Sequence, residues 1–209
     1  MIKMNKPKIN NISIYSLEKA INENELFNYE FNENVNNKCI IRDITIDSCI
    51  FNNIDFSNIN IDRIELLDVI FNNCDLSNKN FDYTNLTRVE FNNCKMVGMS
   101  FIGSSLNDIK ISDSNSKYVN FSDTKITNMN VLNTNFNNIS FMETKLKNIE
   151  FNNVDFNESE ITNTNLNNID FSTSNISNIK IDNISLNGMV IDKFQAIDLV
   201  NLLGVKIKE

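Results

Sequence analysis

Carboxylates are the most numerous charged side chains of this sequence. The 209 residues include 27 Asp and Glu against 19 Lys and Arg, which gives a formal net charge of −8, and they include no histidine. Without histidine the commonest general base is missing, and only four glycines are available to build a phosphate-cradling loop. We therefore expect a binding protein that is not an enzyme and that needs no metal and no cofactor.

The four cysteines are the other side chains that could carry chemistry. They are Cys39, Cys49, Cys74 and Cys94, and their separations do not match the ligand spacing of a zinc site. All four occupy positions that the repeat described below directs inward, so they are predicted to be buried thiols that fill the core. A disulfide between Cys74 and Cys94 stays open, because the repeat places these two residues one coil apart.

The elements that position these side chains follow a period of five residues. From Ile41 to Ile191 every fifth residue is apolar, with the single exception of Ser116. A second series, two residues before each of these centres, is mostly small or apolar, and the other three places in each five are mainly polar. Helices repeat every 3.6 residues and strands every two. The pattern instead predicts short extended segments joined by corners and stacked as a solenoid.

Units such as CDLSN (74–78), TNLTR (84–88) and VDFNE (154–158) resemble pentapeptide repeats. The resemblance implies an all-β fold, a right-handed quadrilateral β-helix with four pentapeptides in each coil. Columns of like residues at the corresponding spacing agree with it, since Phe51, Phe71 and Phe91 fall in one column. The Phe-Asn-Asn triplets that begin at these positions are predicted to form corners, because Asn tolerates left-handed backbone angles better than most residues.

Three regions are predicted along the chain. Residues 1–38 form an N-terminal cap and an irregular first coil, residues 39–191 form the β-solenoid, and residues 192–209 form a C-terminal α-helix and a short strand. In the tail, Asp192 and Gln195 are spaced as a capping box. The apolar band of this tail is wider than a cap for one coil requires, so it predicts a two-fold homodimer. The predicted dimer interface comprises Phe194, Ala196, Ile197, Leu199, Val200, Leu203, Val205 and Ile207.

The same tail resembles the ending of Qnr proteins, the quinolone-resistance branch of the pentapeptide-repeat family. The matching positions are Gly188, Asp192, Gln195, Ala196, Leu199, Leu203 and Gly204. The resemblance implies a dimer that binds DNA gyrase and topoisomerase IV, with a rod shape and an acidic surface that have been likened to B-DNA. Qnr proteins from Gram-negative sources also carry projecting loops that are needed for protection against quinolones. The unbroken five-residue phase leaves no room for such loops here, although some loopless relatives still act on gyrase.

One face of the predicted solenoid is richer in acids than in bases, and we expect it to bind the partner. Its acidic residues are Asp43, Asp62, Asp82, Asp123, Glu143, Glu160 and Asp182. The alternative is a structural or scaffolding solenoid with an unrelated protein partner, whose mild acidity only aids solubility. On either hypothesis the negative charge argues against direct binding of nucleic acid.

Two places interrupt the inward pattern. Lys79 stands at an inward position, so its stem is predicted to be buried and its ammonium to reach solvent. Ser114 and Ser116 are consecutive inward residues, which indicates either a locally irregular coil or a deformable point that faces a partner. No early apolar run resembles a signal peptide, and no stretch approaches the ~20 apolar residues of a spanning helix. We therefore expect a cytoplasmic protein without membrane contact.

Overall fold

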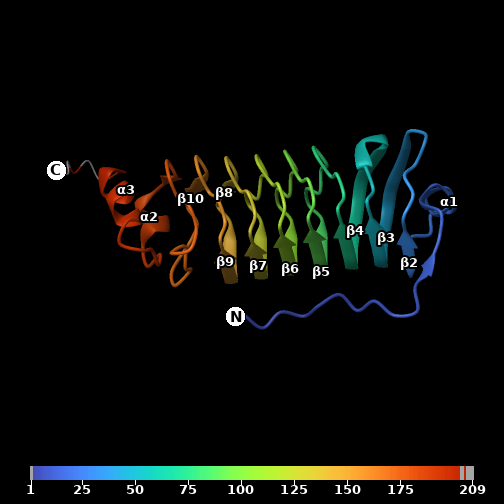
Figure 1. Ribbon diagram of the computed structural model, residues 1–209, viewed down its shortest axis with the longest axis horizontal. Helices are drawn as coiled ribbons and strands as arrows, with labels where there is room; N and C mark the ends of the chain where they lie inside the picture. The colour runs from blue at the N-terminus through green and yellow to red at the C-terminus, as the bar shows by residue number, and fades with distance from the viewer. Residues whose placement is uncertain (1, 203–204, 206–209) are drawn as a thin grey trace.

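The computed structural model describes residues 2–202 and residue 205 and shows a parallel β-solenoid (Figure 1). The long axis runs across the strands, with helix α1 at one end and helix α3 at the other. The predicted β-helix with a C-terminal α-helix is confirmed. The tail beyond Leu202, apart from Val205, lies outside the described residues, and with it the predicted interface positions Leu203 and Ile207.

The strands form two parallel sheets. The larger has eight strands in the order β1-β2-β3-β4-β5-β6-β7-β9, and the smaller has three in the order β11-β10-β8. The bounds are β1 (Ser13–Ile14), β2 (Tyr29–Phe31), β3 (Cys39–Asn52), β4 (Ile59–Asn72), β5 (Asn85–Asn92), β6 (Ser105–Ser112), β7 (Lys125–Leu132), β8 (Ser140–Met142), β9 (Lys145–Asn152), β10 (Glu160–Thr162) and β11 (Lys180–Ile181). Phe51 pairs with Phe71 and Phe71 with Phe91, so the register that the sequence columns predicted is confirmed.

Short helices lie at both ends of the solenoid: α1 (Leu17–Glu23) at one end, and α2 (Asn183–Leu186) and α3 (Gln195–Leu202) at the other. The 3-10 turn η1 (Phe56–Asn58) lies between β3 and β4. Ser16 caps α1 by accepting a hydrogen bond from the Lys19 N–H, because a hydroxyl at this position satisfies one of the free N–H groups of the first turn. Helix α1 buries its apolar side against the first coils and covers the strand edge that the solenoid would otherwise expose.

Stacked aromatic rings form the centre of the rod. The Phe71 and Phe91 rings lie 5.1 Å apart and nearly parallel, and a second column brings Phe101 and Phe121 to 5.2 Å. All four side chains are fully buried. Each aromatic pair adds about 0.5–1.5 kcal/mol beyond the burial of its area. Repetition of one residue type at one column therefore stabilises the stacking of each coil on the next.

Asparagines form the corners, as predicted. Asn53, Asn73 and Asn93 adopt φ angles of 56°, 53° and 52°, in the left-handed region. Their side chains also bond along the rod, since Asn73 Nδ2 donates to Asn53 Oδ1 at 3.2 Å and Asn93 Nδ2 donates to Asn73 Oδ1 at 2.7 Å. A corner Asn thus tolerates the backbone angle and links neighbouring coils at the same time.

The two serines at inward positions do not disturb the coil. Ser114 Oγ accepts a hydrogen bond from the Cys94 N–H at 3.0 Å, and the Ser116 N–H donates to the Asn135 carbonyl at 2.9 Å, in register with the rest of the rod. The prediction of a locally irregular coil or a partner-facing point is wrong, because both serines keep the register and are buried. The Ser114 hydroxyl bonds backbone groups, and the Ser116 hydroxyl donates to Met96 Sδ at 3.6 Å. The four cysteines are all free; Cys49, Cys74 and Cys94 are buried as predicted, whereas Cys39 is only half-buried. Burial raises the pKa of Cys49 to about 11, as fits a thiol that fills the core.

Candidate partner-binding surfaces

The predicted acidic residues do lie on one face of the rod. Asp43, Asp123 and Glu143 occupy a corner, where their φ angles are 53°, 55° and 55°, and all three are exposed. Asp82 precedes the same corner, and Glu160 begins strand β10 on the same face. The structure divides the seven acids into three groups by the partners that their carboxylates have.

Arginines neutralise the acids nearest the N-terminal end. Arg63 binds Asp43 through two hydrogen bonds, with Nε to Oδ1 at 2.6 Å and Nη2 to Oδ2 at 2.9 Å. Arg42 Nε lies 2.8 Å from Asp62 Oδ2. The hydrogen bond from Arg63 lowers the pKa of the Asp43 carboxyl. Since these side chains are more than one third exposed, the pairs contribute little to stability, but they cancel the negative charge of this end of the face.

Two further acids bind backbone groups of their own chain. Asp82 accepts hydrogen bonds from the Ser100 hydroxyl and, at 2.8 Å, from the Ile102 N–H. Asp182 caps helix α2 by accepting from the Ser185 N–H at 2.7 Å, and it also accepts from the Asn163 N–H at 2.7 Å. The bonds from the backbone N–H groups of Asn163 and Ser185 lower the pKa of Asp182. These carboxylates therefore stabilise the fold as well as carrying charge.

The remaining acids are the unpaired ones. Across the part of the chain that the structure describes, the carboxylates of Asp123, Glu143 and Glu160 have no ion pair and no hydrogen bond. Asp123 and Glu143 lie one coil apart and line a shallow groove of about 590 Å³, to which Lys145 also contributes. The available negative charge of the face is thus concentrated in its C-terminal half.

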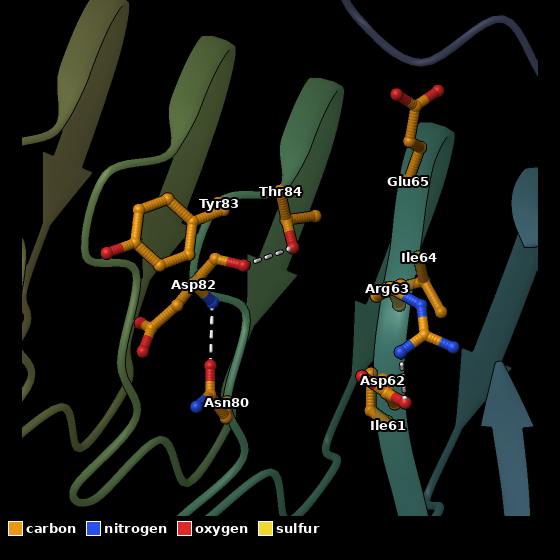
Figure 2. Close-up of a pocket in the computed structure, with 9 residues that line it drawn as sticks. All are labelled: Ile61, Asp62, Arg63, Ile64, Glu65, Asn80, Asp82, Tyr83 and Thr84. Atoms are coloured by element: carbon orange, nitrogen blue, oxygen red, sulfur yellow. Dashed lines mark hydrogen bonds and ion pairs between the residues drawn. The ribbon is translucent and has the colours of Figure 1, made fainter. Parts of the chain in front are cut away.

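A notch interrupts the same face near its other end (Figure 2). It has a volume of about 690 Å³ and is lined by Ile61, Asp62, Arg63, Ile64, Glu65, Asn80, Asp82, Tyr83 and Thr84. In the later coils the Phe81 and Tyr83 N–H groups donate to carbonyls of the following coil, both at 2.8 Å. Among the described residues no such bond joins Ile61 or Arg63 to the coil that follows. The two coils differ along this face, since β4 continues as a strand through Arg63 whereas the next coil forms a turn at Asp82 and Tyr83, although Arg63 and Tyr83 both have a positive φ, of 47° and 55°.

Lys79 lies beside this break. Its Nζ donates a hydrogen bond to the Ile59 carbonyl oxygen at 2.9 Å. This oxygen lies where the ladder of backbone hydrogen bonds between the coils is interrupted. Burial lowers the pKa of Lys79, and the charges of Asp55 and Asp75 oppose that shift. Lys79 is half-buried and still partly exposed, so its ammonium is not withdrawn from solvent, and the free carbonyl of Ile59 gives it a partner on the protein. The inward lysine is the feature of the sequence that marks the notch.

The C-terminal end combines an anchored helix with exposed apolar residues. Asp192 Oδ1 accepts from the Gln195 N–H at 2.9 Å and Gln195 Oε1 accepts from the Asp192 N–H at 2.8 Å, so the predicted capping box is confirmed. Gln195 Nε2 also donates to the carbonyls of Phe171 and Ser174, at 2.9 and 2.6 Å, which fixes α3 to the last coils. Since the amide of Gln195 is buried, the tail is oriented by a satisfied polar contact.

The predicted dimer-interface residues do not all lie on the same side of this helix. Leu199 is buried and joins the core of its own solenoid, so it is not presented to a second copy. Ala196 and Val200 are half-buried. Phe194 and Ile197 are 69% and 49% exposed, and Val205 is exposed as well. The residues available for a second copy are therefore those beside the predicted stripe and not its centre.

The family profile of the pentapeptide repeat region matches residues 44–121 and 84–161, and the profile of pentapeptide repeats (8 copies) matches residues 149–188. Together these matches cover more than half of the sequence. The chain belongs to the pentapeptide-repeat family.

Solved pentapeptide-repeat structures resemble the chain in fold. HetL, a protein involved in heterocyst differentiation regulation from the cyanobacterium Nostoc sp. strain PCC 7120, is 11% identical, with a TM-score of 0.58 over 88% of this chain and 87% of that one. A trypsin-treated form of QnrB1, a plasmid-mediated fluoroquinolone resistance protein, is 23% identical, with a TM-score of 0.46 over 87% of this chain and 89% of that one. No curated protein matches the sequence. At these identities the likenesses concern the fold alone.

Membrane-spanning helices and metal centres are two other features that could define a function for this pentapeptide-repeat protein. No helix within the described residues is long and apolar enough to cross a membrane. The same residues contain no group of three or more acidic, cysteine or histidine side chains placed to hold a metal ion. The surfaces that remain as candidates are the acidic face and the C-terminal end.

Proposed function

We propose that this pentapeptide-repeat protein is a non-enzymatic, homodimeric binding protein of the cytoplasm whose partner is a type II topoisomerase such as DNA gyrase. The tail carries the proposal. Asp192 and Gln195, which match the ending of Qnr proteins, cap each other and fix α3 to the last coils. That anchoring leaves Phe194 and Ile197 exposed at the end of the rod, where a second copy would bury them. More specifically, we propose that the protein protects this topoisomerase from quinolones.

The unpaired carboxylates supply the second support. Duplex DNA has one charge per ~1.7 Å of its axis, whereas Asp123 and Glu143 lie one coil apart, a spacing of about 4.8 Å. The rod therefore matches the shape of DNA better than its charge density, and binding would depend on a few carboxylates. Asp123, Glu143 and Glu160 are the residues we assign to that contact, because neither Arg42 nor Arg63 reaches them.

A gyrase supercoiling assay with the purified protein, with and without a fluoroquinolone, tests the proposal. We expect the protein either to restore supercoiling in the drug, which identifies a protector, or to inhibit supercoiling in both conditions, which identifies a competitor of DNA. No effect in either condition, together with no detectable binding to gyrase, would refute the proposal.

A matched pair of variants assigns the surface. The triple variant Asp123→Asn/Glu143→Gln/Glu160→Gln should bind gyrase about tenfold or more weakly, because removing three charges at roughly 0.5–1 kcal/mol each exceeds the 1.4 kcal/mol of a tenfold change. The control Glu25→Gln/Glu33→Gln/Asp113→Asn removes the same number of exposed charges away from the acidic face. Equal weakening by both variants would show that only the net charge matters.

The ion pairs at the other end of the face favour a second candidate function, that of a scaffolding solenoid with an unrelated protein partner. Arg63 and Arg42 cancel the charges of Asp43 and Asp62, which a surface built to imitate DNA would keep. A pull-down from the source cell distinguishes the two functions. Enrichment of one protein other than a topoisomerase would favour the scaffold.

A further inference from the structure

A strap formed by residues 2–12 runs lengthwise across the coils. In Figure 1 it passes from the N-terminus, below β9, along the edge of the strands to β1 at the opposite end of the rod. Within the described residues it makes no backbone-to-backbone hydrogen bond, the first being that of the Ser13 N–H. The strap is therefore not a strand of the solenoid, and the coils keep all their own bonds without it.

Three carboxylates hold the strap through its backbone. The Ile2 N–H donates to Glu150 Oε2 at 3.1 Å, the Asn5 N–H donates to Asp108 Oδ1 at 3.0 Å, and the Lys8 N–H donates to Asp68 Oδ1 at 2.7 Å. Asn5 Nδ2 adds a bond to Asp108 Oδ2 at 3.0 Å. Apart from this one side chain, the carboxylates bind main-chain N–H groups, so these contacts do not depend on which residues the strap contains.

The spacing of donors and acceptors matches. The donors recur every third residue, which spans about 10 Å in an extended chain at ~3.3 Å per residue. Asp68 and Asp108 lie two coils apart, which is about 9.6 Å at ~4.8 Å per coil. An extended peptide that runs along this corner thus meets Asp68 and Asp108 at residues three apart, and two coils further on Glu150, two residues past the corner, reaches the third N–H.

The two corner carboxylates are held in position before any peptide arrives. Asp68 and Asp108 adopt the left-handed corner angle, and with the strap in place they are 5% and 8% exposed. Arg88 binds Asp68 through two hydrogen bonds, at 2.6 and 2.7 Å, and Asn128 Nδ2 donates to Asp108 Oδ1 at 2.9 Å. Fixed acceptors lower the conformational entropy that the protein's own side chains lose when a peptide binds.

The strap itself shows what kind of peptide fits this corner. Its side chains at Lys3, Lys6 and Lys8 are exposed and carry positive charge above the carboxylates, while Met4 and Ile9 are half-buried. A ligand for the corner is accordingly an extended segment with several lysines, some apolar residues between them, and free N–H groups at every third position.

We propose that the corner formed by Asp68, Asp108 and Glu150 is a docking groove for an extended, lysine-containing peptide of a partner protein, and that the strap is its resident, displaceable ligand. The groove lies on a different corner of the rod from the acidic face, so it is a second interaction surface. A second copy of this chain is a poorer occupant, because its strap would exchange its own groove for an identical one and gain no contact. Tethering gives the strap a local concentration of the order of millimolar, so the strap acts as a competitor that a partner must displace.

The test uses full-length chains and a fluorescein-labelled, acetylated peptide with the sequence of residues 2–12. The variant Asn5→Pro/Lys8→Pro removes the two N–H groups that Asp108 and Asp68 accept, and so releases the strap without changing the groove. The control Lys3→Pro/Lys6→Pro introduces two prolines where the described structure has no backbone bond to the coils. In fluorescence anisotropy the peptide should bind the first variant at least tenfold more tightly than the parent or the control. A peptide with proline at the positions of Asn5 and Lys8 should bind none of them.

Three results would overturn the proposal. The first is no binding of the parent peptide to the released variant at 1 mM, and the second is equal binding to all three proteins. The third comes from mixing isotope-labelled parent with unlabelled released variant and cross-linking the lysines of the strap. A cross-link from a labelled strap to an unlabelled solenoid would show that the groove takes a second copy of the chain and not a partner peptide.

Discussion

Replacing Arg88 by methionine should destabilise the rod measurably, because it removes the partner of a buried carboxylate. Asp68 is 5% exposed and accepts three hydrogen bonds, two from Arg88 and one from the Lys8 N–H. Breaking a buried ion pair from one side costs about 3–5 kcal/mol. The Arg88 side chain remains 19% exposed and the Lys8 bond survives, so we expect the free energy of unfolding to fall by about 2–3 kcal/mol at pH 7. For a chain of this length that corresponds to a decrease in Tm of roughly 4–12 °C.

The pH dependence identifies the cause. Burial alone would raise the pKa of Asp68, but the hydrogen bonds from Arg88 and Lys8 outweigh it and the net shift is downward. A carboxyl whose pKa is lower in the folded state stabilises that state above its unfolded pKa of about 3.9, and the contribution is lost as the pH falls through the folded pKa. The difference between parent and Arg88→Met should therefore shrink as the pH falls below about 4.

Urea unfolding followed by circular dichroism, at pH 7 and at pH 3, measures both effects. The double variant Asp68→Asn/Arg88→Met serves as the control, since it removes the charge that the single variant leaves unpaired, and it should recover more than half of the loss. A loss below about 1 kcal/mol for Arg88→Met at pH 7, or a double variant no more stable than the single one, would refute the reasoning.

Three further predictions concern other parts of the rod. Phe194→Ser/Ile197→Ser should convert a dimer to a monomer in size-exclusion chromatography with light scattering, because these side chains form the exposed apolar end, and an unchanged mass would exclude this interface. Gly103→Ala should lower the free energy of unfolding by about 1–2 kcal/mol in urea titration, because Gly103 has a φ of +66° and an added Cβ would lie 2.5 Å from the Tyr83 ring; a neutral effect would contradict it. Asp182→Ala should lower stability by about 1 kcal/mol through loss of the α2 cap and speed amide exchange there, whereas unchanged exchange would show that the cap is not needed.

The repeat made most of the fold predictable. Because the period fixes both the inward positions and the number of residues in a coil, it predicts that Phe71 lies against Phe91 and that the corner asparagines stack on one another. The same register places Asp43 and Arg63 one coil apart in one column, so their ion pair is also implicit in the repeat. Local chemistry also sufficed for the capping box of the tail.

Features that depend on distant or non-repeating segments could not be predicted. Residues 2–12 have no phase that relates them to the coils, and Ile2 meets a residue 148 positions away in the chain. The notch depends on whether a coil continues as a strand, as β4 does through Arg63, or forms a turn, as the next coil does at Asp82 and Tyr83, and the five-residue pattern is the same for both. The division of the tail stripe, with Leu199 inward and Ile197 outward, depends on how Gln195 fixes the rotation of α3.

The course of the strap has a consequence for how the protein is made. Residues 2–12 are synthesised before the coils, yet their acceptors emerge from the ribosome one after another, Asp68 before Asp108 and Asp108 before Glu150. Domains fold from the N-terminus during synthesis at about 5–20 residues per second, so each further acceptor follows the one before it by several seconds. The nascent end should accordingly fasten stepwise, at Lys8, then Asn5, then Ile2, as each pair of coils is completed. The strap is thus synthesised from Ile2 towards Lys8 but docks from Lys8 towards Ile2. Until the last coils have formed, the residues around Ile2 stay accessible to other factors.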